Sequence, residues 1–148
     1  MKKIATNAKQ YRPHIRWILK KLGLKNYNVI VAFLTVKMAK KFDVIPKEAR
    51  KWTACFSPPS VIWVNPTVIK KGELWLMHIL SHELRHYYQS KTKKFPMVDS
   101  ILKPDHRKMS KKDKQKYLND PREKDAIKFQ LWLADVYEKE INSGKLKL

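Results

Sequence analysis

The chain has 148 residues, 43% of them hydrophobic, which suits a folded domain with a hydrophobic core and argues against disorder throughout. Its one cysteine, Cys55, excludes an internal disulfide and a cysteine-only zinc site, and no segment approaches the run of about 18 apolar residues that a membrane span needs. The formal net charge of +20 attracts polyanions. The N-terminal "MKKIATNAKQ" lacks an apolar run after its lysines, so we expect no signal peptide and a soluble protein of the reducing cytoplasm.

The positive charge is concentrated in two stretches. Residues 1–51 contain 14 basic and 2 acidic side chains, and residues 91–117 contain 10 and 3, whereas the rest of the chain is nearly balanced. Such stretches attract nucleic acid, acidic proteins or an anionic membrane, and they also occur on lysine-rich surfaces without a dedicated partner. Nucleic acid, held through segments 1–51 and 91–117, is therefore one candidate partner.

The first half of the chain mixes helical and strand-like patterns. "YRPHIRWILKKLGL" (11–24) places apolar residues at helical spacing and ends near a glycine, whereas "YNVIVAFL" (27–34) is short and β-branched, which is typical of a strand. "VKMAKKF" (36–42) indicates a short helix. "TACFSPPSVIWVNP" (53–66) predicts two strands joined by a turn at the two prolines. We expect the second, "SVIWVNP" (60–66), at an exposed sheet edge near the cleft, where it pairs with an extended substrate.

The second half is predicted to hold two longer helices, over 69–90 and 121–142, with Asp120 as N-cap and Pro121 at the first helical position of the latter. The lysine-rich stretch 91–117 has no clear period, so we expect a basic loop insertion there. Together these elements predict one α+β domain over residues 1–148, with a small sheet packed on one side of the long helix.

The long helix has two distinct faces. At 100° per residue, His78, His82 and His86 fall on one face. The opposite face forms an apolar stripe that predicts the core contact: Leu76, Met77, Leu80, Leu84 and Tyr87.

His82, Glu83 and His86 form an H-E-x-x-H motif within this helix. Histidines at i and i+4 lie on consecutive turns, so both rings can reach one Zn²⁺ at about 2.0–2.1 Å. Glu83 then lies at the rim of the same face, where it can take a proton from a zinc-activated water and pass it to a leaving amine. The alternative is a helix with two chance histidines. The apolar surroundings favour the zinc site, because a buried histidine or glutamate without a partner is costly.

A catalytic zinc site needs a third protein ligand, and two residues are candidates. Glu123 lies at the start of the last predicted helix, although Asp120-x-x-Glu123 also fits a capping box. His106 lies in the basic loop, where a solvated histidine is equally ordinary. Spacing alone leaves both open.

"HELRHYYQ" (82–89), followed about 30 residues later by "DPREKDAIKF" (120–129), resembles the gluzincin-type zinc peptidases, in particular the ImmA/IrrE-like and related small peptidases of phages and mobile elements. Their pattern is H-E-x-x-H, often with a glutamine shortly after, then P-x-E-x-x-A-x-x-F. The glutamate of the second motif is their third zinc ligand, which the resemblance places at Glu123. Arg85 departs from the uncharged residues that are usual between the two histidines.

The resemblance implies a zincin-like minimal metallopeptidase domain in which the C-terminal helix supplies the third ligand. It also implies a zinc-dependent endopeptidase acting on an intracellular protein or peptide, in the host-cell cytoplasm if a phage encodes the chain. A competing resemblance is to SprT-like peptidases, which act on DNA-bound proteins and use a downstream histidine; His106 would then be the third ligand. A third reading is a non-enzymatic basic protein that binds nucleic acid on a zincin-like scaffold.

Other residues have weaker claims to a role in the site. Tyr117, just before the last helix, is a candidate donor to the oxyanion of a tetrahedral intermediate, or else packs on the helix start. His78 is expected to be a hydrogen-bonded histidine beside the site rather than a ligand. Asp125 and Asp135 are candidates for orienting a zinc-bound imidazole. Arg85 is a candidate for contacting substrate or a neighbouring carboxylate, or else extends to water.

Overall fold

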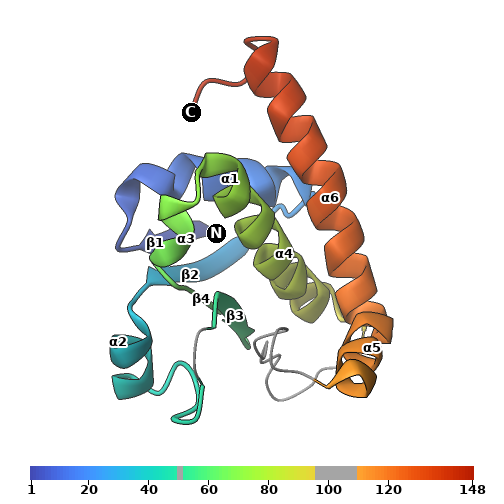
Figure 1. The fold of residues 1–148 in the computed structure, drawn as a ribbon. Helices are drawn as coiled ribbons and strands as arrows, with labels where there is room; N and C mark the ends of the chain where they lie inside the picture. Colours follow the sequence, from blue (N-terminus) through green and yellow to red (C-terminus); the bar gives the residue numbers. More distant parts are fainter. Residues whose placement is uncertain (50–51, 96–109) are drawn as a thin grey trace.

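The computed structural model describes residues 1–49, 52–95 and 110–148 of the chain (Figure 1). These residues form an α+β fold, as the sequence predicts. The sheet is mixed and has four strands, of which the first was not predicted. The strands are β1 (Lys2–Thr6), β2 (Tyr27–Phe33), β3 (Ala54–Ser57) and β4 (Val61–Val64). Within these ranges, no helix has the length and apolar character needed to cross a bilayer.

The sheet has the order β1-β2-β4-β3. β1, β2 and β4 run parallel to one another, and β3 pairs antiparallel with β4. The prediction that the strand within 60–66 lies at a sheet edge is therefore wrong, because β4 is paired on both sides. A strand that is buried on both faces of a sheet is nearly all apolar. The sequence "VIWV" has this character, and it is typical of a central strand rather than an edge strand. The edge on this side of the sheet is β3.

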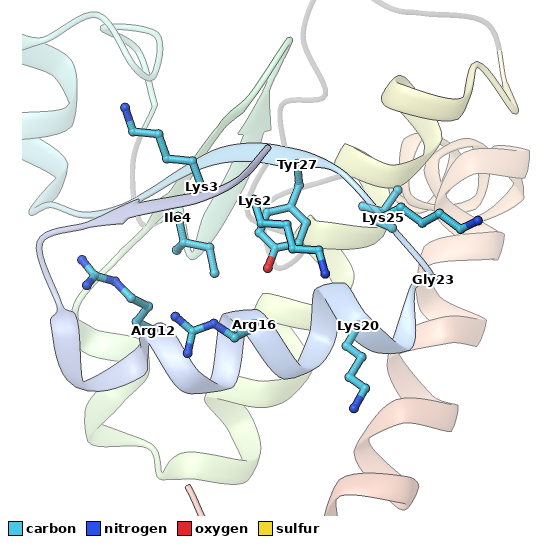
Figure 2. Close-up of a pocket in the computed structure, with 10 residues that line it drawn as sticks. Lys2, Lys3, Ile4, Arg12, Arg16, Lys20, Gly23, Lys25 and Tyr27 are labelled. Carbon is cyan, nitrogen blue, oxygen red and sulfur yellow. The ribbon is translucent and has the colours of Figure 1, made fainter.

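Helix α1 (Arg12–Lys21) connects β1 to β2 and packs its apolar face inward. Ile15, Ile18 and Leu19 are fully buried, as their helical spacing predicts. After the helix, Gly23 adopts a positive φ of 74°, which favours glycine at a helix end. The outer face of α1 carries basic side chains and, with β1, borders an open groove (Figure 2).

At the β3–β4 end, both faces of the sheet are covered. Alternate residues of these strands point to opposite faces, and those on each face join a different core. Phe56, Ile62 and Val64 belong to the main core, which also contains α1 and the long helices. Cys55 and Trp63 point to the other face and join a smaller core under α2 (Val36–Lys41). Cys55 is thus a small side chain buried in this second core.

The predicted helix over 69–90 is divided at Gly72 into α3 (Thr67–Lys70) and α4 (Glu73–Thr92). Gly72 has a φ of 106°, a conformation that interrupts a helix and that other residues rarely adopt. The five residues of the predicted apolar stripe on α4 are all buried. The chain then returns as α6 (Pro121–Asn142), which lies along α4 (Figure 1).

The expected loop over 91–117 is wrong at its C-terminal end, which is helical. Residues 96–109 lie outside the described part of the chain, but Lys111–Asn119 form a helix, α5, that the sequence analysis did not predict. α5 packs against the start of α6. It is the element that places Tyr117 beside the site.

Two leucines close together on α6 differ in burial, so we expect their replacement to have different effects on stability. Leu133 is fully buried, whereas Leu131 is 58% exposed. We expect Leu133→Ala to lower the free energy of unfolding by about 2–5 kcal/mol, because it removes buried methyl groups and leaves a cavity. The matched variant Leu131→Ala should change it by less than about 0.5 kcal/mol. Denaturant unfolding of both variants measures the difference, and equal effects would contradict this packing.

Candidate metal centre

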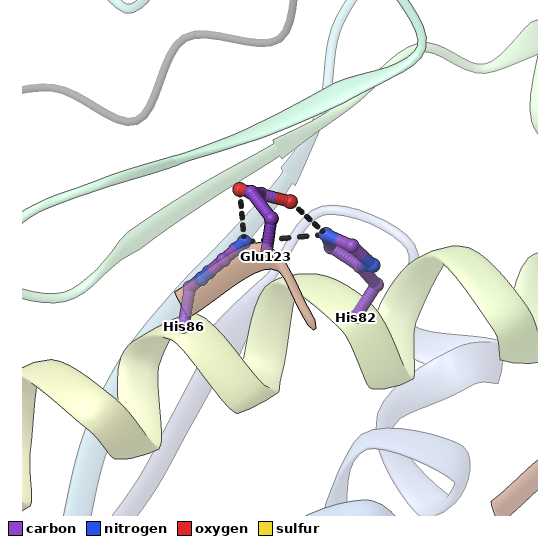
Figure 3. A group of neighbouring side chains, drawn as sticks. All are labelled: His82, His86 and Glu123. Carbon is purple, nitrogen blue, oxygen red and sulfur yellow. Dashed lines mark hydrogen bonds and ion pairs between the residues drawn. The ribbon is translucent and has the colours of Figure 1, made fainter. Parts of the chain in front are cut away.

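His82, His86 and Glu123 form a compact buried cluster between α4 and α6 (Figure 3). His82 Nε2 lies 3.0 Å from Glu123 Oε2, and His86 Nε2 lies 2.9 Å from Glu123 Oε1. The two Nε2 atoms are 3.2 Å apart. The H-E-x-x-H spacing produces this arrangement, because residues four apart stack on one face of the helix.

These distances suit a shared metal ion. Two ligand atoms placed tetrahedrally at about 2.0–2.1 Å from one ion are about 3.3–3.4 Å apart, only slightly farther than the ligand atoms in this cluster. The cluster therefore could hold a metal ion, with two imidazoles from α4 and one carboxylate from α6.

Gln89 fixes which nitrogen of His86 is available. Its amide nitrogen donates to the Arg122 carbonyl oxygen at 3.0 Å and to Asp125 Oδ2 at 2.8 Å. Its amide oxygen therefore faces His86 Nδ1, 2.9 Å away, and accepts the proton of that nitrogen. In the neutral ring, a protonated Nδ1 leaves a lone pair on Nε2, the atom that points into the cluster.

Gln130 does the same for His82. Its amide oxygen lies 2.8 Å from His82 Nδ1, and its amide nitrogen lies 3.2 Å from His78 Nδ1. Burial lowers the pKa of His78, which favours a neutral ring that accepts from Gln130. His78 is thus outside the ligand cluster and orients it through Gln130, close to the role expected for it.

The donor set favours a bound cation. With both Nδ1 atoms donating to glutamines, the cluster presents two imidazole lone pairs and a carboxylate that is 2% exposed. Acceptors brought this close in a buried site repel one another unless a cation or added protons lie between them. The residues present therefore fit a metal ion with nitrogen and oxygen ligands.

Glu123 is oriented by α5 rather than used as a helix cap. Tyr117 donates its hydroxyl proton to Glu123 Oε2 at 2.8 Å. Asp120 caps α6 by accepting from the Arg122 backbone, and its own backbone N–H donates to the Tyr117 carbonyl oxygen. The capping-box alternative for Glu123 is therefore not what the structure shows. Burial and the neighbouring Glu123 carboxylate raise the pKa of Tyr117, so the phenol stays protonated.

Glu83 and Arg85 lie between the two histidines in sequence and have different surroundings. Glu83 is 1% exposed, and its charge adds a smaller contribution to the raised pKa of Tyr117 than burial and Glu123 do. Arg85 forms a two-pronged ion pair with Asp125, at 2.7 and 3.0 Å. Partial burial raises the pKa of Asp125, but the hydrogen bonds from Arg85 and Gln89 outweigh this and lower it to about 2.

Within the described part of the chain, neither aspartate that was a candidate for orienting a zinc-bound imidazole contacts one directly. Asp125 acts on His86 only through Gln89, and Asp135 is exposed and pairs with Lys139. His106 lies outside the described residues. The sequence analysis missed Gln130, although a signal was available: it is seven residues after Glu123, two helical turns along the same face.

No protein-family model matches the chain, and no curated protein or solved structure matches it either. The function must therefore be inferred from the site itself.

The glutamine contacts predict an effect on metal affinity without loss of a ligand. We expect Gln130→Leu to weaken metal binding about 10–100-fold, because His82 loses the acceptor that fixes its ring. Gln130→Glu should bind at least as well as the wild type, since a carboxylate also accepts from Nδ1. Competition with a chromogenic chelator measures both, and Gln10→Leu, at an exposed glutamine of the N-terminal region, is the control. Equal affinity of Gln130→Leu and Gln10→Leu would contradict the role of Gln130.

Proposed function

We propose that the protein is a zinc-dependent metallopeptidase of the zincin-like, gluzincin type. The observation that carries the proposal is the buried cluster of His82, His86 and Glu123, together with Glu83, which follows His82 in the chain and is also buried. Two neutral imidazoles and one carboxylate are the ligands of catalytic zinc sites that keep a fourth position open for water or substrate. Mg²⁺ and Ca²⁺ prefer sites made of oxygen ligands alone, so the two ring nitrogens favour zinc.

The chain's own residues supply the proton transfers of peptide hydrolysis. A zinc ion bound at the cluster would lower the pKa of a water molecule and polarise the substrate carbonyl. Glu83 accepts the proton of the attacking water and then delivers it to the leaving amine nitrogen as the C–N bond breaks. Tyr117 is the proposed donor to the oxyanion: its hydroxyl stays protonated and reaches the ligand Glu123, and its one proton would turn from that carboxylate to the oxyanion.

The sheet edge nearest the cluster suits an extended peptide. β3 pairs with β4 on one side only within the described residues, and it is the strand that packs most closely against α4. A strand edge offers backbone N–H and C=O groups to which a substrate can add as a further strand. We therefore place the substrate along β3, and not along β4 as the sequence alone suggested.

The alternatives remain distinguishable by their ligands. An SprT-like site needs His106 as the third ligand, whereas the proposal uses Glu123, whose carboxylate faces both histidines. A non-enzymatic scaffold has no use for a buried glutamate directly after the ligand His82. The SprT-like alternative predicts that zinc stays bound when Glu123 is replaced. The non-enzymatic alternative predicts that replacing Glu83 changes no activity.

The test of the proposal is hydrolysis of an unstructured protein. Zinc-loaded protein should cleave fluorescently labelled casein, a metal chelator should stop the cleavage, and added zinc should restore it. Chelator-resistant cleavage would point to a contaminating protease or another mechanism. No cleavage of casein or of a mixed peptide library by the zinc-loaded protein would count against a general peptidase.

A further inference from the structure

The groove between α1 and β1 is lined by six basic side chains and no acidic one (Figure 2). It has a volume of about 750 Å³ and is open to solvent. Three of its cations are on α1 and three flank it from β1 and from the turn after α1: Arg12, Arg16, Lys20, Lys2, Lys3 and Lys25. The first acidic residue in the chain is Asp43, so the sequence provides no local carboxylate to neutralise the groove.

The cations of the groove are not used by the fold. Lys21, the neighbouring lysine on α1, pairs with Glu140 at 3.1 Å, but none of the six lining cations has an ion pair within residues 1–49, 52–95 and 110–148. Arg12 Nε is shielded from solvent and has no hydrogen-bond acceptor there. Like charges held together without counter-charges raise the energy of the fold, and a buried donor without an acceptor adds to it. An anion in the groove would relieve both.

The spacing of these cations suits a chain of phosphates. Arg12, Arg16 and Lys20 are four residues apart, so they advance about 6 Å per step along the helix axis, close to the separation of successive phosphates on one strand. Figure 2 shows Arg12 and Arg16 extending from α1 towards β1, and Lys2 extending from β1 into the space above α1. Arg12 and Arg16 from α1 and Lys2 from β1 therefore place positive charge in the space between the two elements, whereas Lys3 and Lys20 extend away from it and widen the basic surface.

We propose that this groove binds the phosphate backbone of duplex DNA without reading its sequence. A single strand is normally held by stacking its bases on exposed aromatic rings, but the one aromatic residue lining the groove, Tyr27, is buried. A duplex keeps its bases inside and presents phosphates alone. An anionic membrane is a poorer fit, because a flat lipid surface does not enter a concave groove.

The groove and the metal cluster are built by different elements. The groove borders the edge strand β1, whereas the cluster lies between α6 and α4, which makes its most extensive strand contacts with β3 at the other edge of the sheet. DNA held at β1 would leave the β3 edge and the cluster open to a protein. The inference does not depend on the proposed peptidase activity, because binding can be measured without any cleavage.

The experiment is fluorescence anisotropy with a labelled 20-base-pair duplex and the zinc-loaded full-length protein at several salt concentrations. The test variant replaces Arg12, Arg16 and Lys20 with glutamine. The control replaces Lys37, Lys40 and Lys41 on α2 with glutamine, which removes the same charge away from the groove. Melting curves and zinc content establish that both variants fold.

We expect the groove variant to bind at least about tenfold more weakly than the wild type at ~0.1 M salt. The slope of log affinity against log salt should fall by about 2 to 3, since each phosphate contact contributes about 0.9. The α2 control should keep most of the affinity. Equal losses in the two variants, or no binding by the wild type even at low salt, would overturn the proposal.

Two further arms test the identity of the ligand. A single-stranded 20-mer that binds as tightly as the duplex would overturn the duplex assignment. Vesicles of phosphatidylserine and phosphatidylcholine that bind through the same three residues and outcompete the duplex would assign the groove to membranes instead. Weaker binding in both arms supports the proposal.

Discussion

Glu83→Gln is expected to lower peptide hydrolysis about 10²–10⁴-fold while zinc stays bound, because glutamine keeps the shape of the side chain but cannot accept a proton. Glu83 is not part of the ligand cluster, so the variant separates catalysis from metal binding. The measurement is the cleavage rate of labelled casein together with zinc content, at equal protein concentration.

Glu138→Gln is the matched control for this variant, since Glu138 is an exposed glutamate on α6. It should cleave at the wild-type rate. If Glu83→Gln retained full activity with its zinc, the general base would be another group and the proposed mechanism would fail. Loss of zinc in Glu83→Gln would mean that the residue supports the cluster rather than the proton transfer.

The second large effect concerns stability. Zinc at about 1,000 times its Kd should stabilise the folded protein by about 4 kcal/mol, because the three ligands come together only when α4 and α6 pack. For a chain of this size that corresponds to a rise in Tm of about 8–16 °C. The measurement is thermal unfolding with and without added zinc after the metal has been removed.

His86→Ala should abolish most of this rise, and Mg²⁺ should not produce it, because that ion prefers oxygen ligands. An equal rise in His86→Ala would show that zinc stabilises the protein from another place. No rise in the wild type would contradict a zinc site formed by α4 and α6.

The ligands on α4 were predictable from the sequence because they depend on local geometry. H-E-x-x-H fixes His82 and His86 on one face whatever the tertiary structure, and the apolar stripe of α4 follows from the same period. Glu123 could not be predicted from local geometry. Spacing did not distinguish it from His106 as the third ligand, and only the family resemblance favoured it. Its approach to the histidines depends on how α6 packs on α4, which local patterns do not encode.

The errors also have physical causes. β1 begins with two lysines and forms an edge strand, so it lacks the alternation that marks a half-buried strand. β4 was expected at an edge, but strand order is a tertiary property that a short apolar run does not reveal. α5 is almost entirely polar, so it shows no apolar stripe, and its packing on α6 is what places Tyr117.

The central claim is that His82, His86 and Glu123 together hold zinc. The most direct measurement is zinc content by elemental analysis of the wild type, Glu123→Ala and His106→Ala, each purified folded and then exposed to zinc. The account predicts about one zinc per chain in the wild type and in His106→Ala, and little in Glu123→Ala. Zinc retained in Glu123→Ala and lost in His106→Ala, or a wild type that never takes up zinc, would contradict it.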